Sequence, residues 1–593
     1  MKKDKANNKQ LSRRDFVTST AAGVGAIAVN GLVSSSAEAQ GLPAKWDKEA
    51  DVVVVGAGAT GLPAAIEAKE NGASVILIDA NWDVGGHAIV SGGNVALGGG
   101  TSRQKKYGVV DSPDLVFSDL TDWSVVEPNG FPDYRYNDRE ILRAFADNCA
   151  PSLEFLIAHG VVFIERAHDI FGGHATGNSA PRENHAAALA WPQVETGVPV
   201  DPARAATTSS GIGVIRPLEA SARKLGVEIL LQHKMTAIVR ESPNSGRVLG
   251  ITTNNEGKTV NIRARKGVII GTGGHSGNVN FRRIFDPRLT EEYNGVAGEP
   301  YSFQDASGEL AGMAIGASLW GTYNQTGEFG QNVTKAGRIG CQYGYVNLAW
   351  QPGSRVFSKA RAIGLRVRDY QNVILVNQAG RRFYDETQGQ YTANNYGDIK
   401  PYTPGSYRNA ADVKFHPANF LNAAMAGTGE SVNGGGPIWA IFDSDAVKRE
   451  EWTVEPPHVD IEAGYFFSGN TIEELAQNIV TKYQRKPMPA SALQETIARY
   501  NSFVDMGKDA DFEKPSPKYK IQTAPFHAAW ATPVPHDSRA GLRINAKCEV
   551  VDWWGNVIPG LYCGGESAGG FSMHGMGRCI VQGRIAGRNA AQS

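Results

Sequence analysis

The chain has 593 residues, of which 41% are hydrophobic, so it is long enough for several domains and can bury a large core. Lys and Arg number 59 and Asp and Glu number 60, which gives a net charge of −1. The chain therefore has no excess of positive charge with which to bind a nucleic-acid backbone. Glycine is abundant, at 69 residues, but the composition excludes a collagen repeat, a coiled coil and a disordered tail.

Residues 1–39 have the features of an export signal. A basic segment contains the pair Arg13-Arg14 with Phe16 two residues on, and an apolar run of small residues follows from about 21 to 33. Ala37-Glu38-Ala39 then provides a cleavage site of the A-x-A kind. Because the apolar run is too short for a membrane span, the pattern predicts a twin-arginine signal peptide, the matching export machinery as a partner, and a periplasmic location. An ordinary signal peptide with a chance arginine pair is the alternative.

The first predicted strand leads directly into a glycine-rich turn. Residues 51–55 (Asp-Val-Val-Val-Val) are mostly apolar, as in a buried parallel strand, and continue into Gly56-Ala57-Gly58-Ala59-Thr60-Gly61 and a helix over 62–68. A second strand, 74–78, ends at Asp79, 18 residues after Gly61. Gly56 would form the tight turn, Gly58 would admit a pyrophosphate, and Gly61 would allow close helix–strand packing. This arrangement predicts a dinucleotide site, with Asp79 accepting hydrogen bonds from a ribose.

Four further glycine-rich segments follow along the chain. They are Gly85-Gly86-His87, Ser91-Gly92-Gly93-Asn94, the strand and turn at 266–274, and a C-terminal strand and turn at 557–566. Each could be an ordinary turn, but together they predict one domain assembled from both ends of the chain. The residues between the two ends would then form an insert over the site.

The five cysteines give no sign of a metal centre. No two of Cys149, Cys341, Cys548, Cys563 and Cys579 are spaced as C-x-x-C. Zinc ribbons, iron–sulfur sets and an attached c-type haem are therefore not expected.

Several segments resemble the flavoprotein family of fumarate reductases, succinate dehydrogenases and 3-ketosteroid dehydrogenases. They are 268–278, 305–314, 376–383 with Glu386, 496–501 with 511–513, and 583–587. The resemblance implies an α/β fold: a discontinuous Rossmann-like FAD-binding domain with an inserted α+β capping domain. The implied boundaries are 47–339 for the first part of the FAD-binding domain, 340–522 for the capping domain, and 523–593 for the C-terminal part.

By this resemblance, bound FAD would contact residues from both ends of the chain. The implied positions are Gly56, Gly58, Ala59, Thr60, Gly61, Asp79, Gly86, His87, Ser91, Gly92, Gly93, Asn94, Ala237, Gly273, Gly274, Asp305, Glu566 and Ile580. Some members bind FAD covalently through a histidine that precedes the second glycine pair. His87 precedes that pair, Gly92-Gly93, by one residue less than their histidine does. Non-covalent FAD is therefore expected.

The chain departs from the family where fumarate reductases hold their substrate. The arginine expected about four residues after Glu386 is missing, and the C-terminal turn 569–578 lacks the family's substrate-clamping arginine motif. A bidentate arginine is the natural partner of a small dicarboxylate, so fumarate itself is disfavoured.

Two roles remain to be assigned: the group that donates or accepts a proton, and the group that polarises the substrate carbonyl. Tyr391 stands near the missing arginine, and His574 lies in the C-terminal turn. Arg539 falls in a substrate-facing loop of the family, and Glu386 with Arg381 matches a proton-relay segment. Each has a structural alternative: aromatic packing for Tyr391, a hydrogen bond to the turn for His574, a salt bridge for Arg539, and an ion pair for Glu386 and Arg381.

The predicted function is an exported FAD-dependent oxidoreductase that reduces or desaturates a C–C bond beside a carbonyl or carboxylate. Hydride would move between the substrate and flavin N5. A cytochrome, a quinol-linked protein or a small acceptor would exchange electrons with it. The alternatives are a ketosteroid-type dehydrogenase with an apolar pocket and a non-catalytic electron-transfer flavoprotein subunit.

Overall fold

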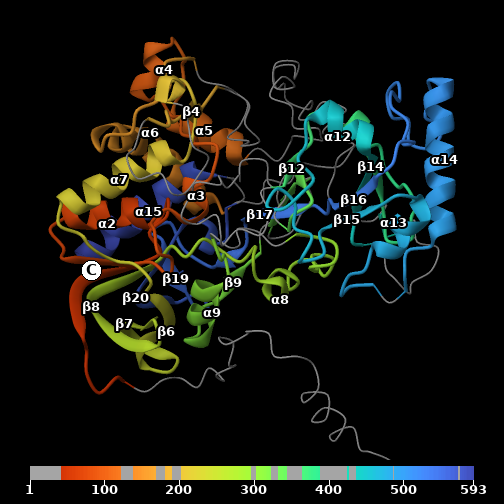
Figure 1. Ribbon diagram of the computed structural model, residues 1–593. Coiled ribbons are helices and arrows are strands. Elements are labelled where there is room, and N and C mark those ends of the chain that lie inside the picture. The colour runs from red at the N-terminus through yellow and green to blue at the C-terminus, as the bar shows by residue number, and fades with distance from the viewer. Residues whose placement is uncertain are drawn as a thin grey trace, which may run out of the picture. The chain divides into compact units, whose positions relative to one another are not determined.

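The computed structural model (Figure 1) describes residues 42–121, 138–167, 180–189, 202–295, 302–321, 331–334, 336–342, 364–387, 424–425, 436–484, 486–571 and 575–593. The predicted signal peptide, residues 1–39, lies outside these ranges. Of the helices within them, none combines the length and apolar character needed to cross a bilayer.

The main sheet contains strands from both ends of the chain. Its path runs β19 (Glu549–Val551), β20 (Val557–Cys563), β8 (Lys258–Ile270), β1 (Lys48–Val55), β2 (Val75–Ile78) and β5 (Glu228–Leu230). β7 (Ser245–Asn255) pairs with β8, and β6 (Lys234–Ser242) pairs with β7. The pairs β20–β8, β8–β1, β1–β2 and β2–β5 are parallel. The prediction of a parallel α/β sheet built from both chain ends is confirmed.

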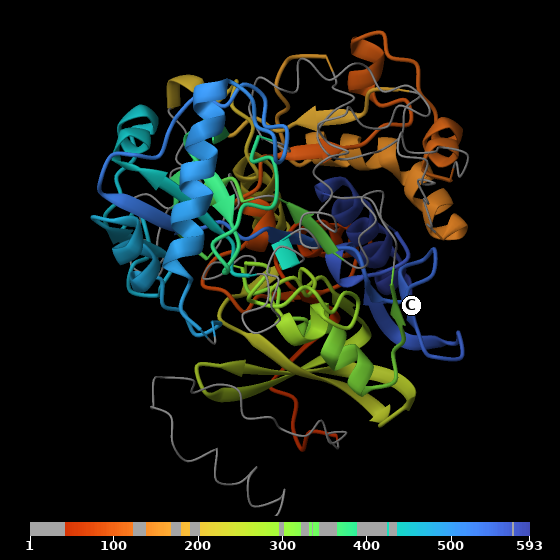
Figure 2. The same cartoon turned by 90° about the vertical axis from the view of Figure 1, so that its right-hand side faces the viewer.

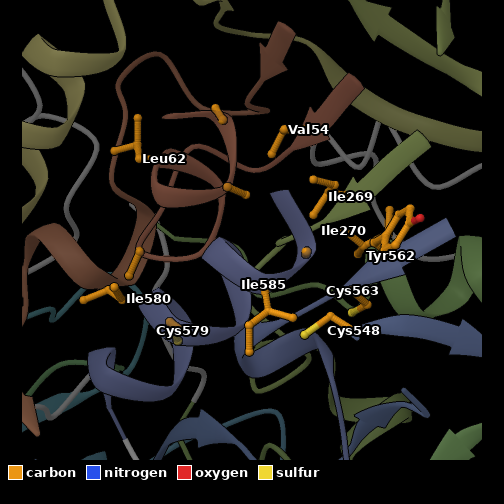
Figure 3. Close-up of a cluster of buried hydrophobic side chains, with 14 of the residues drawn as sticks. Val54, Leu62, Ile269, Ile270, Cys548, Tyr562, Cys563, Cys579, Ile580 and Ile585 are labelled. Carbon is orange, nitrogen blue, oxygen red and sulfur yellow. The ribbon is translucent and has the colours of Figure 1, made fainter. Parts of the chain in front are cut away.

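Helices from distant parts of the sequence pack together against this sheet. α15 (Met576–Gln592) has its most extensive contact with α2 (Gly61–Glu70), and it also contacts α6 (Arg139–Ala158). A Cβ at Gly583 would lie 2.2 Å from the Thr60 carbonyl oxygen, so α15 approaches α2 at a distance that only glycine permits. Figure 3 shows Ile580 and Ile585 of α15 in one buried cluster with Val54, Leu62 and Ile269.

Shorter elements connect these layers. The helices are α3 (Gly86–Ile89), α4 (Ser102–Lys106), α5 (Pro113–Thr121), α7 (Ile212–Lys224), α8 (Val279–Arg282) and α9 (Ser307–Ala314). The strand pairs are β3 (Asn94–Ala96) with β4 (Glu183–His185), β9 (Leu319–Trp320) with β18 (Gly541–Leu542), β10 (Gln331–Thr334) with β17 (Val534–Ser538), and β11 (Arg338–Ile339) with β12 (Leu365–Arg366). Through the pairs with β17 and β18, the C-terminal part is joined to β10 and β9.

A second, antiparallel sheet has cores of its own. Its order is β13 (Ile374–Val376), β14 (Trp439–Asp443), β16 (Phe526–Trp530) and β15 (Phe466–Gly469), accompanied by α12 (Ser444–Glu450), α13 (Ile472–Asn478) and α14 (Ala490–Met506). Alternate residues serve two clusters: Trp439 and Ile441 belong to one, and Ala440 and Phe442 to the other. This period of two is expected of a sheet buried on both faces. The long helix α14 packs against the cluster that contains Trp439. In Figure 2 it is the long blue helix that runs across the strands of the second sheet.

The second sheet does not end at the boundary predicted from the sequence. β16 begins after residue 522, yet it pairs with both β14 and β15 in the middle of the second sheet. The inserted unit therefore extends to at least Trp530, and the return to the main sheet follows it.

Candidate functional site

A pocket opens where the parallel strands of the main sheet end. It encloses about 910 Å³ of atom-free space, counting the part that is open to solvent. The turns after β1, β2 and β8 contribute Gly56, Asp79 and Gly271 to its lining. The carboxyl edge of a doubly wound sheet is where such folds bind their ligands.

The first glycine turn has the backbone geometry that a dinucleotide requires. Gly56 has φ +99°, and a Cβ there would lie 2.2 Å from the Gly271 carbonyl oxygen. A Cβ at Gly61 would lie 1.7 Å from the Gly56 oxygen, so any side chain would separate α2 from β1. At Gly58 the nearest protein atom to such a Cβ is 3.5 Å away, which leaves space on the pocket side.

The N-terminus of α2 is free to face an anion. Thr60, its N-cap residue, makes no side-chain capping bond, and the first turn carries no acidic residue. Gly58, Ala59 and Thr60 line the pocket at this end. The helix end without a side-chain cap and the positive end of the helix dipole fit a pyrophosphate.

Asp79 is fixed at the end of β2 by two backbone donors. The Ala57 N–H donates to its Oδ2 at 2.7 Å, and the Asn81 N–H donates to its Oδ1 at 2.8 Å. Burial nevertheless raises the pKa of Asp79 to about 6, because the two hydrogen bonds offset only part of the desolvation. The carboxylate is therefore rigidly placed and under-solvated, and hydroxyl donors from a ribose would suit it. Together with the glycine turn, it fits the adenosine diphosphate half of FAD.

The pocket lining includes some of the predicted cofactor residues and omits others. Of the predicted set, Gly56, Gly58, Ala59, Thr60, Asp79, Gly86, His87, Gly273, Asp305 and Glu566 line it. Gly61 and Gly274 are not in the lining themselves but directly follow the lining residues Thr60 and Gly273. The residues at 91–94, Ala237 and Ile580 are not in its lining, where Met235 of β6 and Cys579 of α15 appear instead.

Gln304 joins three of the predicted turns, and sequence reasoning missed it. Its Nε2 donates to the Gly273 carbonyl oxygen and to Glu566 Oε2, both at 3.1 Å. Its Oε1 lies 3.3 Å from His87 Nδ1. A lone glutamine before a helix carries no sequence signal, because its importance depends on the meeting of segments hundreds of residues apart. His233 and Lys234, which also line the pocket, were missed for the same reason.

Glu566 is an acid held in a partly buried polar cluster. It accepts hydrogen bonds from the Ser538 N–H at 3.2 Å and from Gln304. Burial raises the pKa of Glu566 to about 7, although the positive charges of Arg578 and Arg539 act in the opposite direction. Near neutral pH the carboxyl group therefore exists in both protonation states.

This pKa predicts a pH-dependent effect of Glu566→Gln in the FAD-free protein. The folded state binds the proton more tightly than the unfolded state, so the stability contributed by Glu566 falls as pH rises from about 4.5 to about 7. The neutral amide should therefore raise the thermal midpoint relative to the native chain at pH 8 and change it little at pH 5. A scanning-calorimetry comparison at the two pH values checks this, with the exposed Glu462→Gln as the surface control; an equal effect at both values would contradict it.

The predicted catalytic residues occupy different surroundings. Tyr391 and His574 lie outside the described residues. Arg539 is 7% exposed and follows β17, and its charge acts on Glu566. Arg381 is exposed and pairs with Glu495 at 3.0 Å.

Glu386 is fully buried in the second-sheet unit. Its Oε1 and Oε2 each accept a hydrogen bond from Arg382, at 2.8 and 2.9 Å, and Lys514 Nζ lies 3.3 Å from Oε2. Asp509 completes the network by accepting from Arg382 at 2.8 Å. Burial alone would raise the pKa of Glu386, but the two cations lower it to about 2. The partner of Glu386 is thus Arg382, next to the Arg381 that the sequence suggested.

Within the described part of the chain, no group of three or more His, Cys, Asp or Glu side chains is arranged to hold a metal ion.

The pocket, its glycine cradle and Asp79 define a dinucleotide site of the FAD type, and the protein is an FAD-dependent oxidoreductase. The chain belongs to the FAD binding domain family, which it matches over residues 51–579. The family resemblance and the FAD cofactor expected from the sequence are confirmed.

The chain is similar to several flavoprotein reductases along nearly its whole length. It is 26% identical to the acrylate reductase flavoprotein subunit of Shewanella woodyi, over 99% of this chain and 100% of that one. It is also 26% identical to the fumarate reductase (cytochrome) of Shewanella frigidimarina, over 91% of this chain and 77% of that one. Among solved structures, 3-ketosteroid Δ1-dehydrogenase from Sterolibacterium denitrificans aligns with a TM-score of 0.60 and 18% identity, covering 92% of this chain and 100% of that one. That structural likeness supports the fold alone.

Proposed function

We propose that this protein reduces a carbon–carbon double bond conjugated to a carboxylate or carbonyl group. The observation that carries the proposal is the end-to-end similarity to the acrylate reductase flavoprotein subunit, because acrylate is the simplest acid with such a bond. The substrate preferred on the sequence evidence is a small enoate with a single carboxylate. Fumarate is disfavoured because the arginine expected after Glu386 and the clamp motif in the C-terminal turn are absent.

Bound FAD would supply the hydride at N5 for one carbon of the double bond. The chain's own residues would hold the substrate away from water and provide the proton for the other carbon. In this proposal the second-sheet unit, 340–522 with β16 added, serves as the capping domain. Tyr391 or His574 donates the proton, Arg539 holds the carboxylate or polarises the carbonyl, and Glu386 with Arg381 supports the relay.

Two further features complete the proposal. Residues 1–39 direct twin-arginine export to the periplasm, where a cytochrome or a quinol-linked protein delivers electrons. FAD is bound non-covalently, because His87 does not stand at the position of the family's covalently bound histidine.

Two other functions remain as alternatives. A ketosteroid-type dehydrogenase is favoured by the spacing of Gly85-Gly86-His87 and Ser91-Gly92-Gly93. A non-catalytic electron-transfer role is the other, and the size of the inserted unit argues against it.

One experiment separates these functions. The purified holoprotein is reduced anaerobically, and its flavin absorbance is followed after addition of acrylate, fumarate, a urocanate-like acid, a cyclic enone or a 3-ketosteroid. Rapid recovery of the oxidised spectrum with a monocarboxylic enoate is expected. Recovery only with the steroid would favour the dehydrogenase, and no recovery with any compound would favour the electron-transfer subunit.

The proton donor is tested by Tyr391→Phe and His574→Ala. Loss of a general acid typically costs 10²–10⁴-fold in rate, so one of the two variants should lower kcat by roughly that factor while retaining FAD. Phe117→Leu, a conservative change on α5, serves as a control for handling and cofactor content. Wild-type kcat in both variants would show that these assignments are wrong.

A further inference from the structure

Phe303 is a half-exposed aromatic residue in the lining of the cofactor pocket. It is 45% exposed, and among the described residues that line the pocket it is the single phenylalanine, tyrosine or tryptophan. Isolated apolar side chains are common on protein surfaces, so the exposure by itself needs no explanation. Two further observations distinguish Phe303: its backbone is fixed, and its ring belongs to a cluster at one end of the pocket.

The segment that carries Phe303 is anchored on both sides of the ring. The Gly277 N–H donates to the Gln304 carbonyl oxygen at 2.9 Å, and a Cβ at Gly277 would lie 2.1 Å from the Phe303 carbonyl oxygen. Gln304 has φ +40°, a left-handed conformation that is costly outside glycine, and its side chain binds Gly273 and Glu566. Because this strained backbone is held by its surroundings, Phe303 is in place before a ligand arrives.

Lys234 of β6 lies beside the ring. Its Nζ is 6.0 Å from the centroid of the Phe303 ring and 2.7 Å from Asp305 Oδ2. The Ser307 N–H donates to the other Asp305 oxygen at 3.0 Å, so the carboxylate that holds Lys234 is itself fixed. Lys234, Phe303 and Asp305 all line the pocket and together link β6 to the start of α9. The aromatic ring is thus oriented by a neighbouring cation but remains uncovered over almost half of its surface.

This cluster is connected to the adenosine end of the pocket. His233, which precedes Lys234, donates its N–H to the Asp79 carbonyl oxygen at 2.8 Å. The Gln232 N–H makes the equivalent bond to the Asn81 carbonyl oxygen, also at 2.8 Å. The Asp79 carboxylate suits the ribose of the adenosine half of FAD, and adenine is bonded directly to that ribose. Phe303 therefore provides an aromatic surface in the part of the pocket that adenine would enter.

We propose that Phe303 is the stacking partner of the FAD adenine and makes the pocket prefer FAD over FMN, the flavin that lacks the adenosine half. The inference rests on the FAD cofactor and does not depend on the proposed reaction. A base stacks on an aromatic side chain through its π-face and needs no dedicated hydrogen-bond donor. Stacking would also cover the apolar ring that is exposed in the absence of a ligand. Phe303 is thus a binding residue that determines cofactor specificity.

The test measures free FAD in ultrafiltrates of diluted holoprotein, which gives the dissociation constant for FAD. Phe303→Leu keeps an apolar side chain but removes the flat ring, and it should raise this constant about tenfold. Phe303→Tyr keeps the ring and should stay within about twofold of the native value. Leu310→Ala is the control, because Leu310 is an exposed apolar residue of α9 outside the pocket lining, and it should leave the constant unchanged.

Two competitors added to the same samples separate stacking from a general distortion of the pocket. The inhibition constant of ADP, which contains adenine, should rise about tenfold in Phe303→Leu, whereas that of FMN should not change. An unchanged FAD constant in Phe303→Leu would overturn the proposal, and so would an equal loss of affinity for ADP and FMN. If Phe303→Leu is purified without FAD, the same constants are obtained by adding FAD back to the full chain. Since no substrate is present, failure of the proposed enoate reduction would leave this result unaffected.

Discussion

Replacing Gly61 with alanine is expected to give a destabilised protein that is purified without FAD. The new Cβ would lie 1.7 Å from the Gly56 carbonyl oxygen, so the glycine turn and α2 must separate. Forced overpacking of this kind costs about 1–3 kcal/mol, and here it also distorts the backbone that approaches the pyrophosphate. The measurements are the flavin-to-protein absorbance ratio and the urea midpoint.

Gly58→Ala is the matched variant in the same turn. A Cβ at Gly58 would meet no protein atom closer than 3.5 Å, so the FAD-free protein should be as stable as the native chain. The added methyl group would occupy space at the pocket lining, and FAD affinity should fall at least tenfold. Normal FAD content in both variants would rule out this turn as the pyrophosphate site. An equal loss of stability in both would contradict the expectation that a Cβ is crowded at Gly61 and accommodated at Gly58.

Removing the carboxylate of Glu386 is expected to destabilise the second-sheet unit strongly. In Glu386→Ala the buried Arg382 would keep only Asp509 as an acidic partner, and Lys514 would lose the carboxylate 3.3 Å from its Nζ. Breaking such a buried network typically costs about 3–5 kcal/mol of the free energy of unfolding. Chemical denaturation followed by circular dichroism measures the change.

Arg381→Ala provides the control for this prediction. Arg381 is exposed and its pair with Glu495 is solvated, so its loss should change stability by less than about 1 kcal/mol. If the two variants were equally stable, the buried network would not carry the stability assigned to it.

The same network predicts acid sensitivity. The pKa of Glu386 is lower in the folded state, about 2, than its ordinary value near 4.5. Its stabilising contribution is therefore complete above about pH 4.5 and is lost as pH falls towards 2. The stability difference between the native chain and Glu386→Gln should shrink over this interval; a constant difference would contradict the assignment.

Local patterns in the sequence were sufficient for the core of the fold. The apolar strand before Gly56, the glycine spacing and Asp79 at the next strand end predicted the first βαβ unit, because each depends on neighbours within about 30 residues. The matching glycine turns near the C-terminus predicted that both chain ends share one site. β20 beside β8 confirms that arrangement.

Other features depend on contacts that no local pattern records. β16 (Phe-His-Ala-Ala-Trp) shows no polar–apolar alternation, and only its pairing with β14 and β15 assigns it to the second sheet. Met235 and Ala237 lie on the same strand, yet only Met235 reaches the pocket lining.

The amino-acid sequence by itself determined the dinucleotide fold, the FAD cofactor and the flavoprotein family. Glycine spacing and the ends of strands can be recognised from residues that are close together in the sequence. Tertiary structure alone decided that Arg382 rather than Arg381 holds Glu386 and that Gln304 joins three turns. The physical reason is that charge compensation and hydrogen bonding depend on which side chains meet in space. Segments as far apart as residues 87, 304 and 566 come together only when the sheet has formed.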